Sequence, residues 1–350
     1  MQSLPLEMKV RKTKIRIQEW YEAWEGQVYV SFSGGKDSTV LKHLVDSMYD
    51  DVPSVFVNTG LEYPEIQKFA RSQKNVTVVT PEMNFREVLT EYGYPIISKE
   101  IAECVRGARK FMDDVKRESP RPRYSYNFRR LTGTGEYSTA NKGRQTNGVA
   151  DKGQSSGERE KAIPKSDRSA YNLERWRFLL DSDFKISEKC CDVMKKKPCK
   201  TYEKQTGRKP FIGTMASESR IRKQAWLRTG CNSFTNRQEK STPMAFWTDQ
   251  DVLQYILENN LEIASVYGSI ERNDDGLLYT TGAARTGCIF CGFGCHLEKE
   301  PNRFQRLRET HPRQYEYCTG GGQYMDGVWQ PSDEGLGLAH VLDYINVKYE

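Results

Sequence analysis

Residues 28–44 read VYVSFSGGKDSTVLKHL, and this stretch decides the fold. Its first five residues are mostly apolar and predict a buried strand, whereas the apolar spacing after the turn predicts a helix. Gly34, Gly35 and Lys36 lie at the turn between the two. Because ligands of open α/β sheets bind where the strands end, we expect a binding site at this turn.

The turn has the composition of an anion site. A glycine-rich turn lets backbone N–H groups converge on one ligand, and the following helix adds its positive N-terminal end. Ser33, Ser38 and Thr39 add hydroxyl donors and Lys36 adds a cation, which together suit a pyrophosphate. The glycines lie too close to the lysine for the G-x-x-x-x-G-K-[ST] loop. A plain strand–turn–helix connection is the alternative interpretation.

Composition places the chain among soluble globular proteins, since 29% of its 350 residues are charged and 37% are hydrophobic. No apolar run approaches the roughly 20 residues of a membrane span, and the N-terminus lacks the apolar core of a secretory signal. We therefore expect a cytoplasmic protein with no membrane contact. In that compartment the nine cysteines are expected to be metal ligands or thiols rather than disulfides.

The pattern of elements predicts the fold class. Three apolar runs (QVYVSF, SVFVNT and VTVVT) predict strands, and the segments between them predict helices at residues 38–48 and 63–71. A further strand is expected at KPFIGTM, and a helix at DQDVLQYILENN after a capping signal at Thr248. This alternation predicts an α/β fold with a doubly wound, mostly parallel sheet and helices on both faces.

The chain divides in sequence order into four parts. They are the N-terminal part of the α/β domain, a polar basic insertion, the remainder of that domain with the cysteines, and a C-terminal extension: residues 1–117, 118–170, 171–300 and 301–350. Residues 106–168 carry 16 Lys/Arg against 8 Asp/Glu, a net charge of +8. Aromatics alternate with arginines in RPRYSYNFRR, so residues 106–168 are either a nucleic-acid contact or a solvated basic loop.

Two motifs carry a resemblance to a known family. SFSGGKDS resembles the signature of the PP-loop ATP pyrophosphatases, and VFVNTGLEYPE resembles the second motif of their phosphoadenylyl-sulfate (PAPS) reductase branch. The resemblance implies an adenine nucleotide alpha-hydrolase-like fold that binds ATP or an adenylyl nucleotide. The phosphate ligands that it implies are Ser33, Gly34, Gly35, Lys36, Asp37 and Ser38, and the neighbouring wall is Asn58, Thr59, Gly60 and Glu62.

The stretch KPFIGTMASESRIRKQAWLRTGC resembles the strand and loop that follow in the same family. The resemblance implies that Ser219 and Arg222 hold the anionic end of the nucleotide. Met215 departs from it, because the reductases have an arginine there. Without the bidentate hydrogen bonds of that arginine, the binding of sulfate or of a 3′-phosphate is expected to be weaker.

The cysteines form two informative groups, an adjacent pair and a distant C-x-x-C. A C-x-x-C alone is compatible with zinc, redox chemistry or an iron–sulfur cluster. The combination resembles the [4Fe–4S] pattern of adenylyl-sulfate reductases, with Lys195 facing a cluster held by Cys190, Cys191, Cys288 and Cys291. The alternatives are a zinc site on Cys288, Cys291, Cys295 and His296, or buried thiols, the interpretation favoured for Cys104, Cys199 and Cys231.

The resemblance implies an enzyme that cleaves ATP between the α- and β-phosphates, or adenylates an acceptor, and couples this to sulfur transfer with the [4Fe–4S] cluster. Lys36 and Asp37 are the expected catalytic residues, with Mg²⁺ sharing the charge of the pyrophosphate. A nucleic acid bound by residues 106–168 is one acceptor that this interpretation allows. A sulfur-donor protein is the implied partner.

Two alternatives remain. One is a PAPS or adenylyl-sulfate reductase that works with thioredoxin and uses Cys318 as its nucleophile, although the family's short C-terminal cysteine motif is missing. Such a thiolate needs a lowered pKa and access to the substrate. The other is a non-enzymatic nucleotide- or nucleic-acid-binding subunit of a modification or defence complex, whose association with nucleic acid depends on salt.

Overall fold

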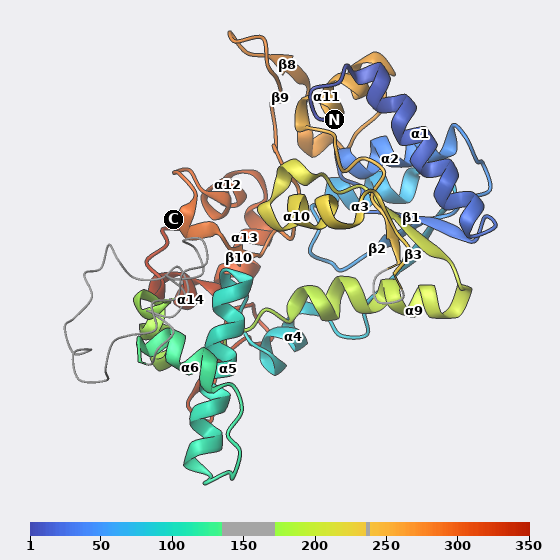
Figure 1. The fold of residues 1–350 in the computed structure, drawn as a ribbon. Coiled ribbons are helices and arrows are strands. Elements are labelled where there is room, and N and C mark those ends of the chain that lie inside the picture. The colour runs from blue at the N-terminus through green and yellow to red at the C-terminus, as the bar shows by residue number, and fades with distance from the viewer. Residues whose placement is uncertain (135–171, 236–238) are drawn as a thin grey trace, which may run out of the picture. The chain divides into compact units, whose positions relative to one another are not determined.

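The apolar start of the quoted stretch forms β1 (Val28–Phe32), an inner strand of a six-stranded sheet (Figure 1). The strand order is β3-β2-β1-β5-β7-β6, and every pair is parallel except β6–β7. Val30 lies opposite Ser54 of β2 on one side, and Val28 lies opposite Lys209 of β5 on the other. The predicted α/β class with a mostly parallel sheet is confirmed.

The computed structural model describes residues 1–134, 172–235 and 239–350. It contains two compact units, each built from two stretches of chain: Met1–Phe85 with Cys191–Ile289, and Arg86–Cys190 with Phe290–Glu350. The division predicted from the sequence instead followed the chain in order. Residues 135–170 of the predicted insertion lie outside the described residues, so its boundaries stay predictions.

The first unit contains the large sheet and a small hairpin. The other strands of the sheet are β2 (Ser54–Val57), β3 (Val76–Val79), β5 (Lys209–Ile212), β6 (Asn232–Ser233) and β7 (Lys240–Ser241). The hairpin is β8 (Ile270–Arg272) and β9 (Leu278–Thr280). The α-helices are α1 (Leu6–Ala23), α2 (Lys36–Asp46), α3 (Pro64–Ser72), α9 (Lys197–Thr206), α10 (Arg220–Thr229) and α11 (Asp249–Glu258). Short helical turns are η3 (Asp192–Lys196), η4 (Ala216–Glu218) and η5 (Ser265–Tyr267).

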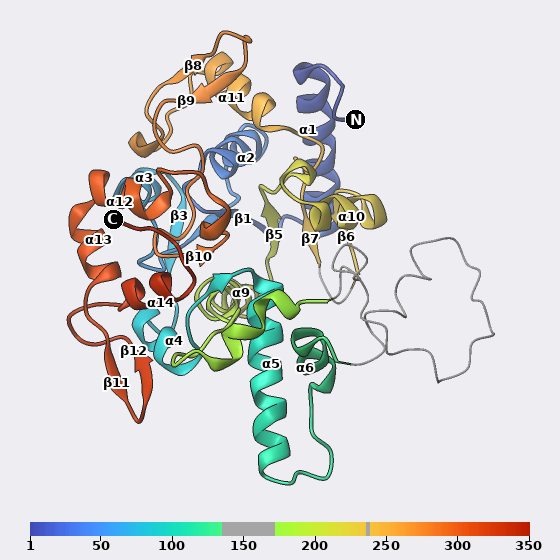
Figure 2. The ribbon, with the colours of Figure 1, turned by 90° about the vertical axis from the view of Figure 1, so that its left-hand side faces the viewer.

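The two faces of this sheet differ in how they are covered. Side chains alternate along a strand, so Val28, Val30 and Phe32 share one face, where they join the buried core with residues of α1, α2, α3 and α11. Tyr29 and Ser31 point to the other face, where α9 runs (Figure 2). Helices therefore lie on both faces, as the sequence predicts, and the α9 face carries more polar residues.

The second unit is mainly helical. Its helices are α4 (Phe85–Glu91, which begins one residue before the unit), α5 (Lys99–Lys116), α6 (Ser125–Thr132), α12 (Arg303–Thr310), α13 (Pro312–Thr319) and α14 (Leu338–Tyr344). Its strands are β4 (Ile96–Ile97) paired with β10 (Gly292–Phe293), and β11 (Gln323–Met325) paired with β12 (Val328–Gln330). Short 3₁₀ turns are η2 (Glu174–Asp181) and η6 (Cys295–Leu297).

One part of the predicted insertion is regular structure. The stretch RPRYSYNFRR was expected to be irregular, yet most of it lies in α6. Arg130 is buried there and its guanidinium contacts Glu100 at 2.6 Å and the Cys104 sulfur at 3.2 Å. The polar composition of this stretch predicted a loop, because composition does not reveal that Arg130 is buried in an ion pair with Glu100.

Among the described residues, no helix has both the length and the apolar character needed to cross a bilayer. The cytoplasmic location stays a prediction.

Helix α11 begins at the predicted cap. The Thr248 side chain accepts a hydrogen bond from the Asp251 N–H, and the Asp251 carboxylate accepts one from the Thr248 N–H at 2.7 Å. Asp251 also pairs with the buried Lys9 of α1 at 2.6 Å. This cap therefore ties α1 to the start of α11.

Replacing a threonine by alanine should have opposite effects at two positions. Thr248→Ala removes the cap and should lower the free energy of unfolding by about 1 kcal/mol. Thr201→Ala in the exposed interior of α9 replaces a poor helix former by the best one and should raise it by a few tenths of a kcal/mol. Urea unfolding measures both, and equal shifts of the same sign would contradict the assigned cap.

Candidate nucleotide site

The predicted phosphate loop joins β1 to α2, as expected. Gly34 adopts a positive φ of 71°, and a Cβ there would lie 2.9 Å from Cγ2 of Ile66. The Ser38 hydroxyl donates to the Gly35 carbonyl at 2.8 Å and lies 3.1 Å from the Ser33 hydroxyl. These hydrogen bonds hold a tight turn. The positive φ and the close contact with Ile66 together explain why position 34 of this turn is a glycine.

A tyrosine from a distant segment completes the loop. The backbone N–H of Lys36 donates to the Tyr267 hydroxyl at 3.2 Å, and this hydroxyl lies 2.7 Å from that of Thr286. Tyr267 is 2% exposed. One of the amides expected to face a phosphate is therefore satisfied by a protein hydroxyl, and Tyr267 joins the loop to the segment that precedes Cys288.

The Lys36 ammonium lies between two carboxylates. Its Nζ is 3.4 Å from Asp37 and 3.3 Å from Asp249. Burial lowers the pKa of Lys36, but the charges of Asp37 and Asp249 raise it, and the net pKa is above its ordinary value. Burial raises the pKa of Asp37, whereas Lys36 lowers it, and its pKa is raised overall. Lys36 is therefore a buried cation at neutral pH.

A charge network extends from Lys36 to the second predicted anion contact. Arg285 lies 3.6 Å from Asp249 and 3.8 Å from Glu218, and Glu218 pairs with Arg222. Ser219 accepts a hydrogen bond from the backbone N–H of Arg222 at 3.2 Å and so caps α10. Ser219 and Arg222 are thus connected to the loop, but their observed partners are protein groups.

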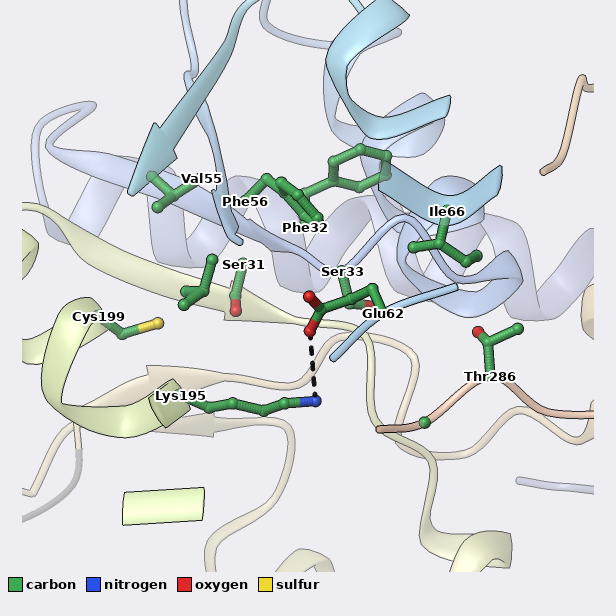
Figure 3. A pocket seen from close by; sticks show the side chains of 12 residues that line it. Ser31, Phe32, Ser33, Val55, Phe56, Glu62, Ile66, Lys195, Cys199 and Thr286 are labelled. Carbon is green, nitrogen blue, oxygen red and sulfur yellow. Dashed lines mark ion pairs between the residues drawn. The ribbon is translucent and has the colours of Figure 1, made fainter. Parts of the chain in front are cut away.

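A cavity of about 120 Å³ opens beside the loop, at the ends of β1 and β2 (Figure 3). Of the residues predicted to bind the nucleotide, Ser33 and Glu62 line it. Lys195, predicted to face the cluster, also lines it. Lining residues that were not predicted to form the site include Ser31, Val57, Ile66, Cys199 and Thr286.

The second motif forms a compact turn at this cavity. The Glu62 carboxylate accepts hydrogen bonds from the Thr59 hydroxyl at 2.7 Å and from the Thr59 N–H at 3.1 Å. Asn58 accepts one from the Gly60 N–H at 3.4 Å. Glu62 also lies 3.9 Å from the Lys195 ammonium, across the cavity in Figure 3. The residues predicted to form a wall therefore fold together next to a cation.

Two of the four predicted cluster ligands belong to the first unit. Burial lowers the pKa of Lys195, but Cys288 and Glu62 raise it, Cys288 also by a hydrogen bond, and Cys191 adds to the effect. The net pKa of Lys195 is raised. Lys195 thus lies close to Cys191 and Cys288, as the resemblance implies.

Cys190 and Cys291 belong to the second unit. Four cysteine thiolates are a suitable ligand set for a [4Fe–4S] cluster. Within the described residues, however, no three or more His, Cys, Asp or Glu side chains are grouped as a metal site. The cluster stays a prediction.

The zinc alternative finds no support in the second unit. The Cys295 thiol donates to the Gly292 carbonyl at 3.0 Å, and burial raises its pKa to about 11. His296 packs edge-on against Trp176, with ring centroids 5.4 Å apart. A zinc ligand must be deprotonated and directed at the metal, whereas the Cys295 thiol is protonated and directed at a carbonyl. Burial lowers the pKa of His296, so its imidazole is neutral.

The remaining thiols separate into two kinds. Cys104 and Cys231 are buried, as predicted. Cys199 was predicted to be a buried thiol as well, but it is half-buried and lines the cavity beside Ser31. It lies on α9, one turn after Lys195, so the spacing along the helix brings both side chains to the same opening.

Cys318 lies in the interior of the second unit. The residue is 0% exposed on α13, and burial raises the pKa of its thiol far above the ordinary value. Within the described residues, no neighbouring cation lowers the pKa of this thiol again. A nucleophilic thiol needs the opposite environment, so this geometry disfavours the predicted catalytic role.

Several cations of residues 106–168 are used inside the second unit. Arg106 pairs with Glu188 at 2.7 Å, and Arg109 donates to the backbone carbonyls of Phe184 and Ser182 at 2.7 Å. Arg130 is paired as described above. Residues 135–168 lie outside the described residues, so nucleic-acid contact by this segment stays a prediction.

Comparison with known proteins identifies a family relationship. The model of the phosphoadenosine phosphosulfate reductase domain matches residues 27–110 and 145–293. An uncharacterized protein of Methanocaldococcus jannaschii is 35% identical over 97 residues. That match covers 26% of this chain and 24% of the archaeal protein, so the chain spans about a quarter of that relative.

Two glycine substitutions should separate backbone strain from damage to the loop. Gly34 and Gly207 both have positive φ, at 71° and 74°, but an added Cβ meets Ile66 only at Gly34. Gly207→Ala should therefore cost roughly 1–2 kcal/mol of unfolding free energy by backbone strain. Gly34→Ala should cost more and should also abolish nucleotide binding. Urea unfolding and ATP titration measure the two effects, and normal ATP binding by Gly34→Ala would contradict the loop assignment.

Proposed function

The chain belongs to the phosphoadenosine phosphosulfate reductase family, and on this basis we propose that it is an enzyme that cleaves ATP, or another adenylyl nucleotide, at the α-phosphate. The observation that carries the proposal is a buried, positively charged Lys36 at the N-terminal end of α2, in the loop beside the cavity. A helix N-terminus and a desolvated cation favour an anion at that position. The proposed substrate is an adenine nucleotide.

In this proposal the loop stabilises the leaving pyrophosphate. Water, or an acceptor where one is bound, attacks the α-phosphorus, and negative charge develops on the bridging oxygen as its bond to that phosphorus breaks. A fixed cation lowers the energy of that state. Lys36 supplies the cation, with the hydroxyls of Ser33 and Ser38 as donors. Asp37 is the residue proposed to bind Mg²⁺, which would neutralise the charge of the phosphates. Asp249 holds the Lys36 ammonium in place until the nucleotide binds.

The [4Fe–4S] cluster is a second part of the proposal. Cys190, Cys191, Cys288 and Cys291 are the proposed ligands, and a cluster at these thiols would supply redox or sulfur chemistry. The proximity of Cys191 and Cys288 to Lys195 supports it, since a cation compensates the negative charge of thiolates. Coupling to a sulfur-donor protein rests on the family resemblance.

The two alternatives differ in their support. The reductase that uses Cys318 is disfavoured by the burial of that thiol. Met215, at the position where the reductases have an arginine, is also buried and directly precedes η4. The non-enzymatic subunit has the same nucleotide site without turnover. Pyrophosphate release from ATP identifies the proposed enzyme, and sulfite release from adenylyl sulfate or PAPS identifies the reductase. Nucleotide binding without either product identifies the non-enzymatic subunit.

The central test replaces one of two buried lysines on α2. Lys36→Met removes the proposed catalytic cation and should lower pyrophosphate release from ATP about 10²–10³-fold. Lys42→Met is the control, because Lys42 is equally buried but pairs with Asp46 at 2.6 Å, away from the loop. ADP and orthophosphate as products, or equal activity of both variants, would refute the proposal. ATP binding without turnover would favour the non-enzymatic subunit.

The cluster has its own test. The chain purified without oxygen should contain about four irons, as a [4Fe–4S] cluster requires. Cys191→Ser and Cys288→Ser should lose iron, whereas Cys104→Ser and Cys231→Ser, at buried thiols outside the proposed set, should keep it. Iron and acid-labile sulfide analysis measures this, and zinc in place of iron would exclude the cluster.

A further inference from the structure

A second cavity in the first unit is larger than the nucleotide cavity and strongly basic. It encloses about 850 Å³ between α9 and the part of the sheet formed by β1, β5 and β7. We call it the α9 groove. The lysines that line it are Lys195, Lys196, Lys200, Lys204, Lys209 and Lys240. Two glutamates, Glu203 and Glu239, also line it, which leaves a net charge of +4.

Both glutamates have partners in the protein. The Glu203 carboxylate accepts a hydrogen bond from the Tyr29 hydroxyl at 2.9 Å, and Glu239 pairs with Lys209. In contrast, no ion pair involves Lys200, Lys204 or Lys240 within the described parts of the chain. Their positive charges are therefore uncompensated in the groove.

The lysines of α9 are regularly spaced. Lys200 and Lys204 lie four residues apart on one face of α9, about 6 Å apart along its axis. Lys196, four residues earlier, is the N-cap of α9 and pairs with Asp192 at 2.7 Å. The interval between Lys200 and Lys204 is comparable with the separation of successive phosphates in an extended single strand. Lysine suits such a ligand, since its flexible stem places a point charge near each phosphate.

The residues that line the groove favour a thin polyanion as its ligand over a protein or a membrane. Protein interfaces are depleted of lysine and need an apolar centre, and membrane-surface helices carry a large exposed apolar face. Residues 191–212 contain no large hydrophobic residue that is exposed. The apolar part of the lining, Pro210 and Ile212, belongs to β5.

The α9 groove and the nucleotide cavity are neighbours. Ser31, Lys195 and Cys199 line both. A ligand held along α9 therefore reaches the nucleotide cavity at Lys195. Helix α9 therefore carries side chains that line both the nucleotide cavity and the α9 groove. Figure 2 shows α9 beside β5.

We propose that the α9 groove binds the phosphodiester backbone of single-stranded nucleic acid and presents one nucleotide of it at the nucleotide cavity. The binding itself stands on the groove, whereas the role of the strand as acceptor rests on the proposed function. This location differs from residues 106–168, where Arg106, Arg109 and Arg130 are engaged inside the second unit.

The test compares two double variants with the same change in charge. Lys200→Gln/Lys204→Gln removes two groove lysines, and Lys68→Gln/Lys74→Gln removes two exposed lysines of the same unit that line neither cavity. The probes are fluorescein-labelled single-stranded DNA and RNA of one sequence, about 16 nucleotides long. Fluorescence anisotropy over a range of salt concentrations measures the affinity and its salt dependence.

The groove variant should bind the probes more weakly, and its slope of log K against log salt should be about 1.4 less steep, since each lost contact removes about 0.7 for a single strand. The control should match the wild type. Equal effects in both variants, or none in either, would overturn the proposal. Polyglutamate that binds as tightly, with the same dependence on Lys200 and Lys204, would also overturn it in favour of an acidic protein.

The DNA and RNA arms identify which nucleic acid binds more tightly. Pyrophosphate release from ATP, measured without any strand, should be unchanged in the groove variant, because neither substituted lysine lines the nucleotide cavity. Failure of strand binding with intact pyrophosphate release would overturn the groove alone. Loss of pyrophosphate release in Lys36→Met with intact strand binding would separate the two sites in the other direction.

Discussion

The candidate site depends on a buried cation, the Lys36 ammonium. Moving an ammonium out of water costs several kcal/mol unless opposite charges compensate for it. Asp37 and Asp249 provide this compensation, but at 3.3–3.4 Å they are more distant than the 2.7–2.9 Å of a tight charge-assisted hydrogen bond. The cation is therefore stabilised without being saturated. An anionic ligand at the loop can approach it more closely than either carboxylate does.

The sheet explains why this cation lies at an opening. On one face, Val30 and Phe32 pack in the core with α2, which fixes the start of that helix and hence Lys36. On the other face, Tyr29 and Ser31 face α9. Within α9, Pro198 is the one buried residue. A helix anchored so lightly leaves space over the strands. The cavity and the α9 groove both occupy that space.

The sequence predicted those features that depend on local chemistry. The strand, the turn and α2 follow from periodicity and from Gly34, which adopts the positive φ that the turn requires. The contact of Tyr267 with the Lys36 N–H could not be predicted, because it joins residues 231 positions apart without a motif. Helix α6 was missed for another reason: its arginines look solvated in composition, yet Arg130 is buried beside Glu100. Tertiary pairing overrides composition in that case.

Two cysteines outside the paired motifs show that sequence spacing does not determine the environment of a thiol. Neither Cys318 nor Cys199 belongs to a paired motif, and the sequence suggested a nucleophile at Cys318 in one alternative and a buried thiol at Cys199. Their environments are opposite: Cys318 is enclosed in an apolar interior that keeps the thiol protonated, whereas Cys199 borders a basic opening near Lys195. Burial raises the pKa of both thiols; at Cys199 the charge of Glu203 raises it further, hydrogen bonds with Tyr29 and Ser31 lower it, and its pKa is raised overall. The fold, rather than the position of a cysteine along the chain, therefore decides which thiol a ligand can reach: Cys199 lines both the cavity and the α9 groove, whereas Cys318 lines neither.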